Sequence, residues 1–565
     1  MRTGATARRL IVFFGLTLMF IFLQAPATYA LEITPDAASI HTAGGLQKGI
    51  WNLWSNGEFG EFVRCDKAGS LKITVVARGS IAGDVWPIMW LSVNDEIVAQ
   101  LDVGSNRFTE YTFEQKVEAG IHRITVVFLN NTKLGNEDRN LYIARMTVTP
   151  GTGRREPRRA SVEEWRRHVG AAKEKAEEKV LAQSAAVIEK HRKGDAVVRV
   201  LGADGKPLQG AAVSAVQVRH NFLFGCNIFK FNRFKTPEHN ALFEQRFREL
   251  FNYATTAFYW RPYERVKGKP AYVYTDRIVA WCQKHGIRLK GHPLLSHNRA
   301  GTPIWADGQF PPPEARKQRV HDIITRFGHA IEFWEVVNEP SHHPGLTIDD
   351  PYRWARAARP KAYLIVNDFS ALVYGYPPFF ELLVEAQRRG VPFDGIGIQA
   401  HEPRTMRFPL DRVRRYLDRY AQIGKDLHIT EFTPTSSGQP ITGSHRHGPW
   451  NEAAQAEYAV RFYTVCFGHP AVKAITWWDL CDQGAWLEGG GLLRADLSPK
   501  PAYVQLKDLI QRQWKTRCSG TTNAAGELTF RGFYGTYQVS VEVNGSRVVK
   551  EFHLEEGKPN VFSIP

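Results

Sequence analysis

Two glutamates, Glu339 and Glu431, are the residues of this chain whose type and placement point most directly to chemistry. Each ends a short apolar run, residues 333–339 and 427–431. Two carboxylates can cut a glycosidic bond, because one protonates the leaving oxygen while the other attacks the anomeric carbon or activates water. Asn338, beside Glu339, could hydrogen-bond a sugar 2-hydroxyl, a contact that tightens in the transition state. The alternative is that both glutamates form salt bridges at the end of a barrel.

The elements that would position these residues are eight apolar runs, most of them followed by a helix-like stretch. The runs are residues 222–227, 253–257, 288–292, 333–339, 363–368, 395–401, 427–431 and 472–478. Strands that alternate with helices predict a parallel sheet, and eight such units predict an α/β fold, a (β/α)8 TIM barrel over residues 221–513. Most runs end in a polar or aromatic residue: Asn227, His292, Glu339, Asp368, His401, Glu431 and Trp478. Because a barrel has its active site at the carboxyl ends of its strands, we expect these side chains to converge in one cleft.

Six segments of this barrel resemble glycoside hydrolase family 10, whose best-known members are endo-β-1,4-xylanases. The segments are residues 291–297, 334–339, 395–401, 428–431, 476–478 with Asp482 and Trp486, and 499–503, in the order that the family has them. The resemblance implies hydrolysis of β-1,4 linkages by double displacement, with Glu339 as general acid/base and Glu431 as nucleophile. It implies no cofactor for catalysis.

The same resemblance implies roles for residues around the two glutamates. His401 would hydrogen-bond Glu431 and keep it ionised. Contacts with the sugar at the cleavage site are implied for five further side chains: His292, Asn338, Gln399, Trp478 and Trp486. For any one of these histidines or tryptophans alone, core packing is the alternative interpretation. We also expect the like charge of Glu431 to raise the pKa of Glu339.

Residues 257–261 depart from the family pattern. The family usually has a Glu-Asn pair and a lysine there, which bind sugar on the non-reducing side, whereas this chain has Ala-Phe-Tyr-Trp-Arg. Arg261 would then replace the lysine as a sugar-binding residue, and Ser296 stands where the family has tryptophan. Xylan or a related plant polysaccharide is therefore the expected substrate. The alternatives are a different β-glycan specificity and a non-catalytic carbohydrate-binding protein.

Residues 31–150 predict an all-β sandwich, because short β-branched runs alternate with Gly, Asn and Asp clusters. Within them, residues 128–131 and 137–143 resemble the calcium-dependent xylan-binding modules of carbohydrate-binding families 36 and 60. The resemblance implies sugar binding and a calcium site at Asp138 and Asn131. Asn131 stands where the family usually has Asp, and Ala144 stands where an acid often follows, which lowers the charge available to calcium. A plain turn is the alternative.

The remaining segments connect and flank these two parts. Residues 151–192, rich in Glu, Lys and Ala, predict a linker of one or two helices that starts near Ser161. Residues 193–220 and 514–565 have the pattern of short strands with Gly turns. Two strands alone cannot bury a face, so we expect these two segments to form one small β-sandwich.

The N-terminus predicts a signal peptide over residues 1–30, with Arg2, Arg8 and Arg9 before an apolar run at 11–23. We expect a monomer that is secreted, periplasmic or at the cell surface, with no membrane attachment after cleavage; an uncleaved anchor is the alternative. The net charge is +16, but no nucleic-acid-binding motif accompanies it, so the expected partner is a polysaccharide and not nucleic acid. Six cysteines without a Cys-x-x-Cys pair do not make a disulfide scaffold.

Overall fold

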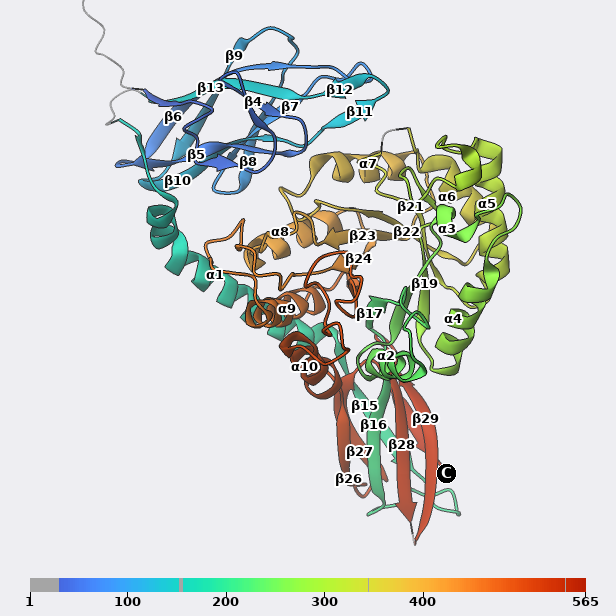
Figure 1. Ribbon diagram of the computed structural model, residues 1–565. Helices are drawn as coiled ribbons and strands as arrows, with labels where there is room; N and C mark the ends of the chain where they lie inside the picture. Colours follow the sequence, from blue (N-terminus) through green and yellow to red (C-terminus); the bar gives the residue numbers. More distant parts are fainter. Residues whose placement is uncertain (1–29, 152–155, 344, 544) are drawn as a thin grey trace, which may run out of the picture.

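The computed structural model describes residues 30–151, 156–343, 345–543 and 545–565. The predicted signal peptide lies outside the described residues, apart from its last residue. Figure 1 shows a barrel, an N-terminal β-sandwich on one side of it and a small β-sandwich on another, with one long helix running between the two sandwiches. Among the described residues, no helix is both long and apolar enough to cross a membrane.

The central domain is a closed barrel of parallel strands. Its strands are β17 (Leu223–Asn227), β18 (Tyr253–Ala257), β19 (Arg288–His292), β20 (Leu295–Ser296), β21 (Phe333–Asn338), β22 (Tyr363–Asp368), β23 (Gly395–Ala400), β24 (Asp426–Phe432) and β25 (Val472–Trp477). The strands pair in this order around the barrel, with the two-residue β20 as an extra pairing on β21. Pairing of β19 with β21 and of β17 with β25 closes the ring, so the predicted (β/α)8 barrel is confirmed.

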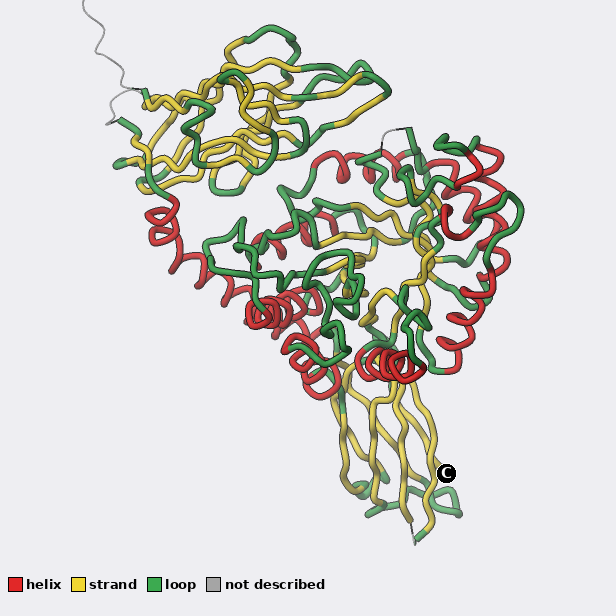
Figure 2. Tube along the Cα trace, in the orientation of Figure 1, coloured by secondary structure: helices red, strands yellow, loops and turns green. Residues whose placement is uncertain are grey.

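Helices cover the outside of the barrel (Figure 2). They are α2 (Pro237–Leu250), α3 (Trp260–Tyr263), α4 (Tyr272–Lys284), η1 (Ile304–Ala306), α5 (Pro313–Phe327), α6 (Asp349–Ala358), α7 (Pro377–Arg388), α8 (Leu410–Ala421), α9 (Glu452–Phe467), α10 (Pro501–Asp508) and η2 (Leu509–Gln513). Strands such as β21 and β23 are buried along their whole length, as expected for a parallel sheet covered by helices. Their polar residues therefore lie inside the barrel or at its rim.

The N-terminal module is a sandwich of two antiparallel sheets. Its strands are β1 (Leu31–Ile33), β2 (Ile40–His41), β3 (Gly45–Gln47), β4 (Ile50–Leu53), β5 (Gly57–Cys65), β6 (Gly69–Gly79), β7 (Ile88–Val93), β8 (Glu96–Asp102), β9 (Thr109–Val117), β10 (Gly120–Phe128), β11 (Thr132–Leu134), β12 (Glu137–Arg139), β13 (Leu141–Pro150) and β14 (Arg158–Arg159). The hairpin β11–β12 extends from it.

A single helix, α1 (Val162–His191), leaves the module and runs along α8 and α9 of the barrel. Ser161 and Glu164 cap its start reciprocally, each side chain binding the other's backbone N–H. Midway along the helix, the buried Glu177 carboxylate pairs with Arg407 of the barrel at 2.8 Å. This pair fixes the helix against the barrel.

The small sandwich combines strands from both sides of the barrel in the sequence. They are β15 (Lys193–Val200), β16 (Ala212–His220), β26 (Arg517–Thr521), β27 (Glu527–Phe533), β28 (Gly535–Val543), β29 (Ser546–Leu554) and β30 (Val561–Ile564). In one sheet β15 pairs with β27 and β30, and in the other β16 pairs with β26 and β28. The barrel is therefore inserted between two halves of one β-domain.

The N-terminal module packs directly on the barrel. Trp90, Val127 and Leu129 of the module are buried in the same apolar cluster as the barrel core. At the edge of this contact, Asp95 pairs with Arg412 of α8 at 2.8 Å, and both side chains are largely buried. Module and barrel thus share a core and an ion pair.

Candidate active site

Glu339 and Glu431 face the same hydrogen-bonded pair of side chains. Glu339 directly follows β21 and Glu431 lies near the end of β24. Gln399 donates its amide to Glu339 Oε1 at 2.9 Å and lies 3.1 Å from His401 Nε2, which is 3.6 Å from Glu431 Oε2. The last distance is longer than a hydrogen bond, so His401 contacts both Gln399 and Glu431 but bonds only the amide.

A second set of contacts holds the Glu431 carboxylate, through Asn367 of the strand β22. The Asn367 amide nitrogen, at the end of β22, lies 3.1 Å from Glu431 Oε1, 3.0 Å from Glu335 Oε1 and 3.2 Å from Asn338 Oδ1. Asn338 and Glu431 therefore share the Asn367 amide, and the contact of Asn338 with a sugar 2-hydroxyl stays a prediction. Asn367 was not predicted from the sequence, although it precedes Asp368 at the end of the fifth run.

Glu335 is a third carboxylate of the site that the sequence analysis missed. It is fully buried and pairs with Lys290 Nζ at 3.2 Å and His292 Nδ1 at 2.7 Å. Burial alone would raise the pKa of Glu335, but the charges of His292 and Lys290 lower it. Its signal in the sequence is a charged residue inside an otherwise apolar run. His292, Glu335 and Glu431 also approach one another closely enough to hold a metal ion, but the Lys290 ammonium already supplies a cation to Glu335.

The pKa values of the two glutamates are split in the direction opposite to the expectation. Burial raises the pKa of Glu431 well above its usual value, and the charges of Glu335 and Glu339 raise it further. Burial also acts to raise the pKa of Glu339, but the hydrogen bonds from His343 and Gln399 outweigh it and bring that pKa to about 2. His343 Nε2 lies 3.4 Å from Glu339 Oε2, a contact that the expectation from like charge alone left out.

Aromatic side chains line the site next to the carboxylates. Trp478, after β25, meets the His292 ring edge-on at 5.3 Å, and Tyr259 O–H lies 3.0 Å from His292 Nε2. Trp486 stacks on His401 with ring centroids 4.4 Å apart and stays 45% exposed. Arg261 lies on the short helix α3, and it is Tyr259, two residues earlier, that contacts His292. Tyr259 is thus a candidate site residue within residues 257–261, the segment that differs from the family pattern.

The predicted metal residues lie in the N-terminal module. Asp138 lies opposite Lys133 in the β11–β12 hairpin. The Asn131 amide faces the main-chain oxygens of Arg139 and Trp54. With its nitrogen turned toward these oxygens, it donates to that of Arg139 at 2.7 Å and to that of Trp54 at 3.3 Å. With its oxygen turned toward the same two carbonyls, Asn131 would instead supply one of the six to eight oxygen ligands that calcium requires. The calcium site at Asp138 and Asn131 thus depends on which way the Asn131 amide faces, and it stays a prediction.

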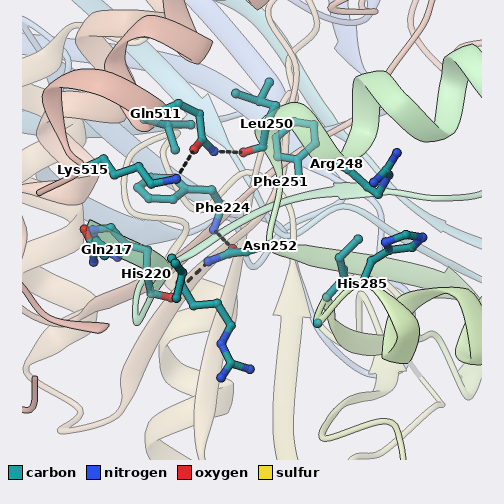
Figure 3. A pocket seen from close by; sticks show the side chains of 15 residues that line it. Gln217, His220, Phe224, Arg248, Leu250, Phe251, Asn252, His285, Gln511 and Lys515 are labelled. Carbon is teal, nitrogen blue, oxygen red and sulfur yellow. Dashed lines mark hydrogen bonds between the residues drawn. The ribbon is translucent and has the colours of Figure 1, made fainter. Parts of the chain in front are cut away.

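A separate cavity of about 190 Å³ lies between the barrel and the small sandwich (Figure 3). Residues that precede β17, β18 and β19 line it, together with Phe224 at the start of β17 and with Ile510, Gln511 and Lys515, so the cavity lies at the amino ends of the strands. Asn252 bridges this region, accepting from the Phe224 N–H at 2.9 Å and donating to the His220 carbonyl at 3.2 Å. In a barrel of this kind the amino end contributes stability, and this cavity contains neither Glu339 nor Glu431.

Comparison with known families accounts for both large parts of the chain. The family model for glycosyl hydrolase family 10 matches residues 215–509, more than half of the 565 residues. The chain belongs to glycosyl hydrolase family 10. A second family model, that of the calcium-dependent xylan-binding carbohydrate-binding module, matches residues 72–163 of the N-terminal module.

Several proteins resemble the family 10 chain. The anti-sigma-I factor RsgI6 of Acetivibrio thermocellus is 25% identical over 63% of this chain and 45% of its own length. Endo-1,4-beta-xylanase B of Thermotoga neapolitana is 29% identical over 43% of this chain and 75% of its own. Xylanase 10B from Thermotoga petrophila RKU-1, solved with xylobiose, is 24% identical with a TM-score of 0.45, over 52% of this chain and 95% of that one. The chain thus spans less than half of the length of RsgI6.

Proposed function

We propose that the chain is a retaining glycoside hydrolase that cuts β-1,4 linkages in xylan or a related plant polysaccharide. The observation that carries this proposal is the link through Gln399 and His401 between Glu339 and Glu431, at the carboxyl ends of β21 and β24 of a family 10 barrel. The names of the xylanase relatives support the choice of xylan.

In this proposal Glu431 attacks the anomeric carbon while Glu339 protonates the leaving oxygen. Glu339 then removes a proton from the water that hydrolyses the glycosyl-enzyme. Burial lowers the pKa of His401 to about 3, so His401 is neutral at neutral pH and stays a hydrogen-bonding partner. For catalysis, Glu339 and Glu431 together must carry one proton, and this proton must lie on Glu339 when sugar is bound. A glycosidic oxygen beside Glu339 favours that location, because it accepts a hydrogen bond only from the protonated acid.

Reducing-end release from a panel of xylans and β-glucans tests this function. Release from xylan with the β-anomer formed first, followed by proton NMR, supports a retaining xylanase. Faster release from a glucan would indicate the different β-glycan specificity. Binding of polysaccharide without any release would support the non-catalytic alternative.

We expect the activity to extend to low pH. Catalysis needs one proton on the pair, and the acid limb of kcat/KM marks the pH at which a second proton binds. Because the pKa of Glu339 is lowered to about 2, the second proton binds only as the pH falls through about 2. The alkaline limb lies above the usual carboxyl range, since the pKa of Glu431 is raised. The measurement is kcat/KM on an aryl xylobioside across pH, with circular dichroism at each pH as a control for unfolding.

The variant His343→Gln sharpens this prediction. Without the imidazole, the pKa of Glu339 loses the largest influence that lowers it, so the acid limb should move upward. A wild-type acid limb at the ordinary glutamate value of about 4.3 would contradict the assignment.

We propose that the enzyme is exported and acts as a monomer. The charged N-terminus and the apolar run at residues 11–23 support export. The polymeric substrate supports it too, because xylan lies outside the cell.

We propose that the N-terminal module binds polysaccharide without calcium, with the Asn131 nitrogen turned toward the main-chain oxygens of Arg139 and Trp54 in place of a cation. The match to a xylan-binding module family supports the sugar binding. Calcium should then leave the thermal unfolding of the wild type unchanged relative to EDTA.

The variant Asn131→Asp should gain calcium binding, because a carboxylate facing two carbonyl oxygens favours a cation. At about 10 mM calcium, a dissociation constant of about 10⁻⁴–10⁻³ M would stabilise the variant by about 1–3 kcal/mol. Calorimetric titration of both proteins measures this gain. Calcium binding by the wild type with the same affinity would overturn the proposal.

A further inference from the structure

The loop between β22 and α7 has an uncommon backbone. Ser370, Tyr374 and Tyr376 have φ angles of 60°, 55° and 29°, in the left-handed region that residues with a side chain rarely adopt. Such conformations cost free energy and persist only where the surroundings enforce them. This loop follows Asp368 at the active-site end of the barrel, so what enforces it bears on the site.

Two side chains of the N-terminal module hold this loop. Asn56 donates its amide to the Tyr376 hydroxyl at 3.3 Å, and Arg123 donates to the Tyr374 hydroxyl at 3.1 Å. Both tyrosines are almost fully buried. Arg123 is itself fixed by ion pairs with Glu58 and with Asp95. In Figure 1 the module lies over α7, which begins directly after Tyr376.

The loop in turn holds the segment that carries Glu339. The Tyr376 ring stacks on His342 with centroids 4.5 Å apart and planes 6° from parallel. His342 Nδ1 lies 2.6 Å from Asp368 Oδ1, and the His342 N–H donates to the Glu339 carbonyl at 3.1 Å. Glu339 also has a left-handed φ, 55°. The turn that presents its carboxylate is thus packed against a side chain that the module holds.

We propose that the N-terminal module positions the acid/base carboxylate of the barrel through Asn56, Tyr376 and His342. The module is then part of the active-site framework in addition to any sugar binding of its own. This inference rests on the proposed role of Glu339. Asn56 and Tyr376 act through His342 and are positioning residues.

Two substrates with different leaving groups distinguish a misplaced acid from a general loss of active-site structure. When the glycosidic C–O bond of a xylo-oligosaccharide breaks, the leaving oxygen takes the proton of Glu339, because an alkoxide is a poor leaving group. A 2,4-dinitrophenolate leaves with the bonding electron pair and needs no proton. Because kcat/KM reports steps up to the first bond cleavage, a misplaced acid lowers kcat/KM for the first substrate and spares the second.

The test compares Asn56→Ala and Tyr376→Phe with the wild type, each as the full chain. We expect kcat/KM on xylotetraose to fall about tenfold or more, since small displacements of a reacting group have effects of this order. On 2,4-dinitrophenyl β-xylobioside we expect a change of less than about twofold.

The matched control is Glu96→Gln, which breaks the exposed pair of Glu96 with Arg415 at the same junction between module and barrel. It should leave the ratio of the two substrates unchanged. Equal losses on both substrates, no loss on either, or the same split in Glu96→Gln would overturn the inference. Asn56 is a partly exposed loop residue, so its variant remains informative should Tyr376→Phe not fold. A wild type that cleaves neither substrate would instead refute the proposed function.

Discussion

Replacing Glu431 with alanine is expected to lower kcat on xylan by about 10⁴-fold or more, the scale seen when an enzyme nucleophile is removed. Glu431 is buried at the end of β24, and its carboxylate is the one that Asn367 and His401 approach. Without it, no glycosyl-enzyme forms, so good leaving groups do not restore the rate. Reducing-end release from xylan and phenolate release from an aryl xylobioside measure the loss.

Added azide provides the control for folding of this variant. A small anion can occupy the space left by the carboxylate and attack the same face of the sugar, which gives an α-glycosyl azide. Glu381→Gln is a matched substitution on α7, at a carboxyl whose pKa burial also raises but which lies outside the site. It should retain wild-type turnover. Unchanged turnover in Glu431→Ala would remove Glu431 as nucleophile.

The barrel could be predicted because each strand keeps its own signal. The run at residues 253–257, for example, coincides with β18, and the run at 363–368 coincides with β22. Both are short, β-branched or apolar, and bounded by helical stretches, which is the pattern of a strand buried on both faces. Polar residues at the carboxyl ends then gather in one place by the geometry of the barrel alone.

Of the site, only the residues at the carboxyl ends of the strands could be predicted. Lys290, His292 and Glu335 form a buried ion-paired group, but Lys290 and Glu335 lie within strands and do not end them. The predicted direction of the shift in the pKa of Glu339 was wrong. That shift depends on His343, which the left-handed turn at Glu339 brings close to the carboxylate. A contact made by a turn of this kind leaves no periodic signal in the sequence.

The packing of the module on the barrel was also not predicted, although a signal exists. Strand β7 is apolar at Met89, Trp90 and Leu91, on both of its faces. Met89 and Leu91 lie in the core of the module, whereas Trp90 lies in the core shared with the barrel. A strand of an antiparallel sandwich that exposes one face to water should alternate, so an apolar run without alternation indicates a covered outer face.

Replacing Glu339 with alanine is expected to give the largest difference between the loss of kcat/KM on xylotetraose and the loss on 2,4-dinitrophenyl β-xylobioside. Loss of the acid should lower kcat/KM on xylotetraose about 10²–10⁴-fold, the contribution typical of general acid catalysis. On 2,4-dinitrophenyl β-xylobioside, kcat/KM should remain near that of the wild type, because that leaving group needs no proton. Stopped-flow measurement of phenolate release should then show a burst, since the same residue is needed as base in the second step.

Azide should accelerate turnover of the Glu339→Ala variant on the dinitrophenyl substrate and give the β-glycosyl azide. The anion here attacks the glycosyl-enzyme from the face where Glu339 stood, opposite to Glu431. The two alanine variants therefore predict azides of opposite configuration, and that pair of products assigns each carboxylate to its own face of the sugar. An α-azide from Glu339→Ala would exchange the proposed roles. Equal losses on both substrates would indicate instead that Glu339 supports the structure of the site and does not donate the proton.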